Sequence, residues 1–133
     1  MDINITQWAL DSYLDLKQKK VFSDQEYRQI IRPDVLRLLT YPNDLKFTQN
    51  KFWSQATMGN GIVIADGYKM KWHQIGCGLV QLRLMVGIVG GEAYLCEAYV
   101  KSDDKLDKRM MAKLKVYLDL IRKGRFITRG KLV

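Results

Sequence analysis

The sequence predicts an α+β fold: a single domain, residues 1–133, with an N-terminal strand and a two-helix hairpin packed on a small antiparallel sheet, followed by a C-terminal basic helix. Three observations predict it. Apolar residues recur at helical spacing in residues 7–41, change to strand-like runs between glycine turns in residues 62–100, and return to helical spacing in residues 103–123. With 47% hydrophobic residues, a chain of this length can build a core without disulfides or metals.

The first strand and the first helix follow directly from the start of the sequence. Residues 2–6 alternate polar and apolar side chains and include β-branched residues, which predicts a short strand. Residues 7–19 then place Trp8, Tyr13, Leu14 and Leu16 near one helical face, with a basic last turn that suits the negative end of a helix dipole.

A second helix is expected after a capping box. Ser23 and Glu26 have the spacing at which a serine hydroxyl accepts from the backbone amide three residues later. Apolar residues at spacings of three and four continue to about residue 41, and Pro33 is placed to bend the helix. The two helices are interpreted as scaffold, because their basic and acidic residues balance.

Residues 43–60 show no clear period, although the aromatic residues Phe47, Phe52 and Trp53 are expected to dock on the core. Residues 62–65 and 68–72 then look like two strands joined by a turn at Asp66-Gly67.

The remaining elements are two strands and one helix. Residues 79–89 form an apolar run suited to a central strand, Gly90-Gly91 turns the chain, and residues 92–100 supply the next strand. The last helix is expected to start at Ser102 or Asp103 as N-cap and to end before Gly124, with an apolar stripe formed by Leu106, Met110, Leu114, Tyr117, Leu118 and Ile121.

Composition excludes several classes of function. The two cysteines, Cys77 and Cys96, exclude a disulfide framework, and the single His73 has no metal-ligand neighbours at a recognisable spacing. No phosphate-binding glycine loop and no serine-hydrolase elbow occurs. No apolar run approaches the roughly 20 residues that cross a bilayer, and no signal peptide is recognisable, so neither membrane insertion nor secretion is expected.

The excess of positive over negative charge is confined to one half of the chain. The formal net charge is +8, yet residues 1–66 hold 8 basic and 8 acidic side chains, whereas residues 67–133 hold 14 basic and 6 acidic ones. Such segregation predicts a basic face that meets a polyanion or an acidic partner. A solvated surface with a basic tail is the simpler alternative.

The cationic side chains of residues 68–73 share one strand face. In an extended chain Tyr68, Met70 and Trp72 point one way, and Lys69, Lys71 and His73 point the other. This stretch, together with residues 82–84 and 94–102, resembles the RelE/HigB/ParE superfamily of bacterial toxins, which are small basic ribonucleases or gyrase poisons. In the RelE branch one strand carries Lys-x-Lys, the next carries an arginine, and a basic residue ends the last strand.

The resemblance implies a cytoplasmic toxin of a toxin-antitoxin system that cleaves messenger RNA on the ribosome without metal or cofactor. The 2′-hydroxyl attacks the adjacent phosphate, so the protein must accept one proton, donate another and stabilise added negative charge. Lys69 and Lys71 match the Lys-x-Lys feature, Arg83 matches the arginine, and Lys101 matches the terminal basic residue approximately.

By this similarity Lys71 is the expected general base, and Lys69 and Arg83 are expected to stabilise the phosphate. Lys101 is a candidate acid or phosphate contact. His73 is a candidate for either proton transfer, or simply a histidine near the end of the strand. Repulsion between Lys69 and Lys71, roughly 7 Å apart on one strand face, would lower the pKa of the base.

RNA binding is expected from Tyr99, as a base-stacking ring, and from Lys105, Lys108 and Arg109 of the last helix. Sheet packing is the alternative for Tyr99. The implied partners are messenger RNA, the ribosome and a cognate antitoxin protein, whose acidic or amphipathic segment would cover the cationic face.

Two other functions remain open. The protein could be a non-catalytic module that uses the basic last helix to bind nucleic acid or a protein such as gyrase. It could also be a cassette protein of a mobile element that keeps the toxin fold without the activity.

Overall fold

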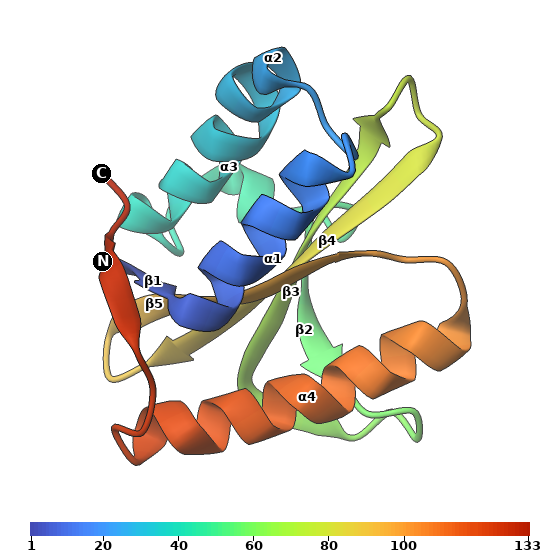
Figure 1. Cartoon of the computed structure of the whole chain (residues 1–133). Helices are drawn as coiled ribbons and strands as arrows, with labels where there is room; N and C mark the ends of the chain where they lie inside the picture. Colours follow the sequence, from blue (N-terminus) through green and yellow to red (C-terminus); the bar gives the residue numbers. More distant parts are fainter.

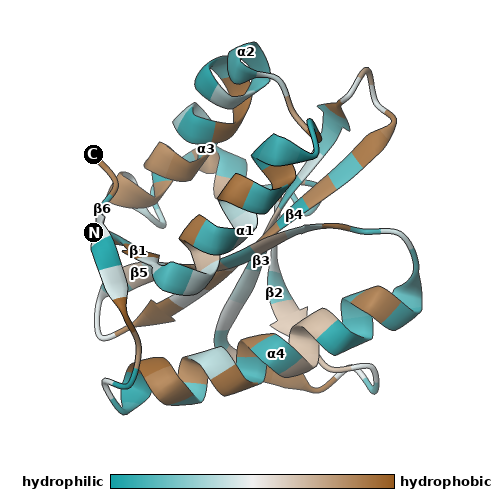
Figure 2. Cartoon of the chain, viewed as in Figure 1, coloured by the Kyte–Doolittle hydropathy of each residue, from teal (hydrophilic) through white to brown (hydrophobic).

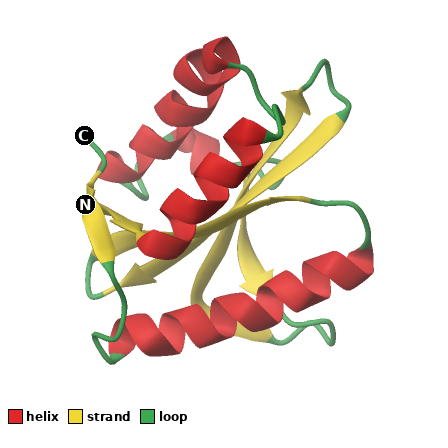
Figure 3. Cartoon of the chain, viewed as in Figure 1, coloured by secondary structure: helices red, strands yellow, loops and turns green.

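The computed structural model describes residues 1–133 and contains a six-stranded sheet with helices on both faces (Figures 1 and 3). The strand order is β2-β3-β4-β5-β1-β6, in which β1 runs parallel to β5 and all other neighbours are antiparallel. The strands are β1 (Ile3–Thr6), β2 (Trp53–Thr57), β3 (Val63–Ile75), β4 (Val80–Val89), β5 (Glu92–Val100) and β6 (Thr128–Lys131). The helices are α1 (Gln7–Gln18), α2 (Asp24–Glu26), α3 (Arg32–Leu36) and α4 (Asp104–Arg122).

The predicted α+β class is therefore confirmed, with its N-terminal strand and its C-terminal helix. The sheet differs from the prediction, because it is larger and mixed rather than small and antiparallel. The parallel pair arises because β1 enters the sheet beside β5, about ninety residues later in the chain, with Ile3 opposite Ala93. The last strand, β6, was not predicted and pairs with the free side of β1.

The second predicted helix begins where the sequence places it but is not one regular helix. Ser23 and Glu26 form the complete capping box, with each side chain bonded to the other residue's backbone amide. The chain then widens into a π-helical turn, Tyr27–Ile31, before α3, and ends in a 3₁₀ turn, Arg37–Thr40. Pro33 accounts for the wide turn, because it has no amide hydrogen to continue the α-helical pattern.

The middle of the chain contains one strand that was not predicted and one prediction that was wrong. Residues 53–57 form the edge strand β2, although no period indicated it. The expected turn at Asp66-Gly67 does not exist, because β3 runs without interruption through these residues. Asp66 takes a positive φ of 66°, so the chain is distorted there without reversing.

A contact with α4 explains the glycine at position 67. Gly67 lies opposite Gly87 of β4, and the side chain of Leu118 packs on both. A Cβ atom on Gly67 would lie 3.1 Å from a methyl carbon of Leu114, and one on Gly87 would lie 2.7 Å from a methyl carbon of Leu118. The two glycines thus form the depression into which the buried Leu118 fits.

We expect Gly87→Ala to destabilise the fold by about 1–3 kcal/mol, because the added methyl overpacks the interface with α4. Urea denaturation followed by circular dichroism measures this loss. In the Leu118→Ala background the Leu118 methyl groups are absent, so the same change should cost clearly less. An equal cost in both backgrounds would show that the contact with Leu118 is not responsible.

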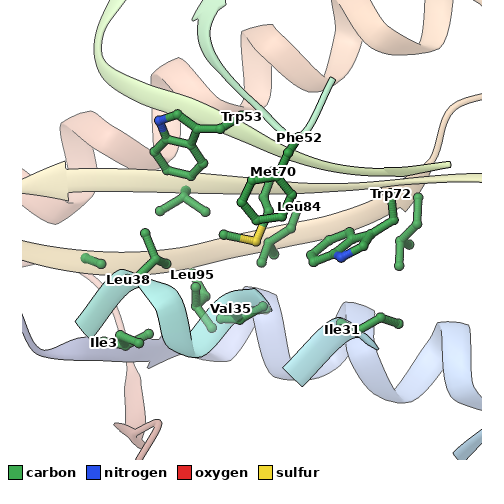
Figure 4. Packing of buried hydrophobic residues seen from close by; sticks show 14 of the residues in the cluster. Ile3, Ile31, Val35, Leu38, Phe52, Trp53, Met70, Trp72, Leu84 and Leu95 are labelled. Atoms are coloured by element: carbon green, nitrogen blue, oxygen red, sulfur yellow. The ribbon is translucent and has the colours of Figure 1, made fainter. Parts of the chain in front are cut away.

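The sheet separates two hydrophobic clusters. The larger one joins the sheet to α1 and to the segment containing α2 and α3. Figure 4 shows Met70, Trp72 and Leu84 directed toward the segment that carries Ile31 and Val35. The smaller cluster lies under α4, whose buried residues are Met110, Met111, Leu114, Leu118 and Ile121. Figure 2 shows the corresponding alternation of hydrophilic and hydrophobic segments along α4.

A buried carboxylate ties the larger cluster together. Asp34 of α3 is 4% exposed and accepts a hydrogen bond from the Trp72 indole nitrogen at 2.9 Å. Its other oxygen accepts from Arg37 at 2.9 Å and from Lys46 at 2.7 Å. The charge of Asp34 is therefore fully compensated, although both cations remain partly exposed.

The last helix agrees with the prediction. Asp103 is its N-cap and accepts from the Leu106 amide at 2.7 Å. Gly124 follows the helix with φ of +68°, a conformation that favours glycine. None of the helices combines the length and the apolar character that a membrane span requires.

Candidate nucleic-acid site

The cationic residues predicted from the sequence meet on the sheet face that α4 covers. Lys71 of β3 lies opposite Arg83 of β4, and Arg83 lies opposite Tyr99 of β5. Lys69 lies two residues before Lys71 on β3 and faces the same side. Alternation along β3 sends Met70 and Trp72 into the larger cluster on the other face. We call Lys69, Lys71, Arg83 and Lys101 the cation cluster.

Lys71 occupies the centre of the cation cluster. Burial lowers the pKa of its ammonium group, and the positive charges of Lys69, Arg83 and Lys101 lower it further. The negative charge of Asp107 opposes this shift but does not cancel it. No carboxylate forms an ion pair with Lys71, and the side chain is only partly exposed. The neutral amine, which can accept a proton, therefore forms at a lower pH here than on an ordinary surface lysine.

Arg83 is more deeply buried than the sequence suggested, with 5% of its surface exposed. One terminal nitrogen donates to the Leu82 carbonyl at 3.3 Å and the other to the side-chain oxygen of Gln81 at 3.1 Å. Its Nε has no hydrogen-bond partner. Arg83 is therefore fixed by neutral groups and keeps an unpaired positive charge on the strand next to Lys71.

Asp107 of α4 projects into the cation cluster, and the sequence interpretation did not include it. Its carboxylate accepts hydrogen bonds from the Tyr99 hydroxyl and from Lys69, the latter at 3.3 Å. Burial alone would raise the pKa of Asp107, but the bond from Tyr99 and the charge of Lys69 outweigh burial and leave the pKa below its usual value. Asp107 is therefore ionised at neutral pH.

A signal in the sequence could have identified Asp107. It precedes the buried residues Met111, Leu114 and Leu118 by four, seven and eleven positions, which is the spacing of one helical face. The helical period thus places its carboxylate against the sheet. An acidic residue on the inward face of a basic helix requires a cationic partner, which is Lys69.

The structure does not support the stacking role expected of Tyr99. The residue is 6% exposed and belongs to the hydrophobic cluster under α4. Burial and the bond to Asp107 raise the pKa of its hydroxyl, so it stays protonated and donates. The alternative interpretation, packing on the sheet, describes this residue better.

Lys101 and His73 differ in how they relate to the cluster. Lys101 follows β5, and its positive charge contributes to the lowered pKa of Lys71. Its ammonium group lies 3.8 Å from the exposed carboxylate of Asp104, so it is only loosely held. The imidazole of His73 instead contacts the Lys51 carbonyl at 3.0 Å, and no hydrogen bond joins it to the cation cluster.

The three predicted RNA-binding residues of the last helix are exposed and form no ion pairs. Lys105, Lys108 and Arg109 lie in the first turns of α4, on the sides that face solvent. They extend the positive charge beyond the buried cluster. No three histidine, cysteine, aspartate or glutamate side chains lie together in a way that could hold a metal ion.

Comparison with protein-family models finds no match, and comparison with curated proteins finds no similar sequence.

Proposed function

We propose that this protein is a RelE-like toxin of a bacterial toxin-antitoxin system and cleaves messenger RNA at the ribosome without a metal ion. The observation that carries the proposal is the environment of Lys71, a partly buried lysine without a carboxylate partner among three other cations. Such a site attracts a phosphodiester and contains an amine that loses its proton more readily than an ordinary lysine.

The chemistry divides between the members of the cluster. Neutral Lys71 accepts the proton of the ribose 2′-hydroxyl while its oxygen bonds to phosphorus. Lys69 and Arg83 stabilise the added negative charge of the phosphorane. Lys101, loosely held and about one-third exposed, donates a proton to the 5′ oxygen as the phosphorus bond to that oxygen breaks. The products are a 2′,3′-cyclic phosphate and a 5′-hydroxyl.

The direct test uses ribosomes that carry a defined messenger RNA. The ribosomal complexes are first cross-linked, EDTA is then added, and the purified protein is added last. We expect cleavage fragments that carry a 5′-hydroxyl and a cyclic phosphate. Fragments that carry a 5′-phosphate, or no fragments at all, would contradict the proposed reaction. Induction of the chain in bacteria without an antitoxin should stop growth and leave the same fragment ends.

Replacement of Lys69 tests the lowered pKa of Lys71. The positive charge of Lys69 lowers the pKa of Lys71, so Lys69→Gln should raise the pKa of Lys71. Because neutral Lys71 is the active form, the rate rises with pH through this pKa. The rising limb of the pH–rate profile should therefore move to higher pH.

Single-turnover cleavage rates measured across the pH range give the midpoint of that limb. Lys17→Gln, which changes an exposed lysine of α1, is the matched control and should leave the midpoint unchanged. If the midpoint does not move in Lys69→Gln either, Lys71 is not the base.

The exposed cations of α4 favour a second candidate, a non-catalytic module that binds nucleic acid or an acidic protein surface. Lys105, Lys108 and Arg109 have no acidic partners, so they are available to a polyanion. This function requires the outer face of α4 and not Lys71. Replacement of these three residues by glutamine would then abolish growth inhibition, whereas Lys71→Gln would preserve it.

A further inference from the structure

The cation cluster already contains one anion, which the protein itself supplies. Asp107 lies four residues, about one helical turn, after the N-cap Asp103, on the side of α4 that faces the sheet. Its two carboxylate oxygens have separate donors, one the Tyr99 hydroxyl and the other Lys69. Its charge also acts on Lys71 and Arg83.

A carboxylate does not satisfy all the donors of this cluster. Both oxygens of Asp107 are used, yet Arg83 Nε remains without an acceptor although the residue is 95% buried, given its exposed fraction of 5%. Lys71 likewise has no anionic partner. A phosphate group presents more oxygens than a carboxylate, in a tetrahedral arrangement, and can serve more donors at once.

We infer that the Asp107 carboxylate occupies the position of the substrate phosphate, so that RNA must displace it before Lys69, Lys71 and Arg83 can act. The inference rests on the proposed function for the identity of the anion. Asp107 is thus neither a base nor a phosphate ligand but a competitor built into α4.

The local structure allows such a displacement. The Asp107 side chain is 19% exposed, so it is not sealed in the core. It lies near the start of α4, whose preceding residues 101–103 have no regular secondary structure. One carboxylate also leaves the four cations of the cluster with a net positive charge, which continues to attract a polyanion.

The test measures binding and not cleavage. The probe is a short 2′-O-methyl RNA, which keeps the phosphates but has no free 2′-hydroxyl to react. Fluorescence anisotropy at fixed salt gives its affinity for the wild-type protein, for Asp107→Asn and for Asp104→Asn. The last two variants change the formal charge equally. Asp104, however, is 91% exposed, and its carboxylate contacts only Lys101, at 3.8 Å.

We expect Asp107→Asn to bind the probe about tenfold more tightly or better, because the competing charged hydrogen bonds are lost. Asp104→Asn should gain no more than about threefold, as expected for an exposed and screened charge. Equal gains in the two variants would show a general charge effect and overturn the inference. A loss of affinity in Asp107→Asn would also overturn it, since Asp107 would then support binding.

Should Asp107→Asn not fold, the wild-type protein provides the answer. The carboxyl carbon-13 signal of Asp107 should shift progressively as the RNA probe is added, because the bonds to Tyr99 and Lys69 are broken. A signal that stays constant while the probe binds contradicts displacement.

These results separate the inference from the proposed function. Tighter binding by Asp107→Asn, together with no cleavage by the wild-type protein, would support the competitor and reject the nuclease. Cleavage by the wild-type protein that is lost in Asp107→Asn, with unchanged binding, would support the nuclease and reject the competitor.

Discussion

Replacement of Lys71 by glutamine should lower the rate of RNA cleavage by about 10²–10⁴-fold, the contribution expected of a general base. Glutamine keeps most of the length and volume of the side chain but accepts no proton at neutral pH. Single-turnover cleavage of a ribosome-bound messenger RNA measures the rate. Affinity for the uncleavable RNA probe should fall much less, because Lys69, Arg83 and Lys101 remain.

The stability of the Lys71→Gln variant distinguishes lost chemistry from lost structure. Burial and neighbouring cations disfavour the charged form of Lys71, so its removal should leave the free energy of unfolding unchanged or higher. Lys17→Gln serves as the matched control for both activity and stability. If Lys71→Gln cleaves RNA at the wild-type rate, the role assigned to this residue is wrong.

Replacement of Asp34 by alanine should reduce the free energy of unfolding by about 3 kcal/mol, because the indole N–H of the buried Trp72 then loses its acceptor. The same change leaves Lys46 without its carboxylate, whereas Arg37 keeps its ion pair with Asp44, so these losses cost less, also because both cations are partly exposed to water. Urea unfolding followed by tryptophan fluorescence and by circular dichroism measures the loss.

The matched control for Asp34→Ala is Asp15→Ala, which breaks the exposed ion pair with Lys19. That pair should contribute less than about 1 kcal/mol. A similar loss in both variants would mean that the buried carboxylate does not stabilise the fold more than a surface one. Because β3 carries both Trp72 and Lys71, Asp34→Ala should also reduce cleavage where unfolding becomes appreciable.

The fold was predictable where a periodic pattern of apolar residues or a helix-capping residue acts within one element. The strand before α1, the capping box at Ser23 and the N-cap at Asp103 all depend on residues within a few positions of one another. The edge strand β2 was not predictable in this way, because Trp53 and Ala56 become buried only by packing on distant elements. The π-helical turn before Pro33 likewise reflects a backbone conflict that apolar spacing does not reveal.

The Asp66-Gly67 pair shows how a local signal is overridden. Its sequence is typical of a hairpin turn, yet Gly67 is accounted for by the close approach of Leu114 and Leu118, about fifty residues later. A pattern of neighbours along the chain cannot report a contact over that distance. The strand therefore continues where a turn was expected.

The candidate site was predictable in its cations but not in their surroundings. Strand alternation places Lys69 and Lys71 on one face, and antiparallel pairing brings Arg83 opposite Lys71. What alternation cannot indicate is the cover over that face. Because α4 lies over it, Tyr99 and Arg83 are buried, and Asp107 enters the cluster.

The position of β1 has a consequence for how the chain is synthesised. This strand emerges first from the ribosome, but both of its neighbours in the sheet, β5 and β6, come from the last third of the sequence. A nascent chain therefore keeps residues 3–6 unpaired until translation has passed residue 95. The entropic cost of bringing β1 and β5 together grows only slowly with the length of chain between them. The delay before β1 pairs is therefore set by the speed at which the ribosome elongates the chain.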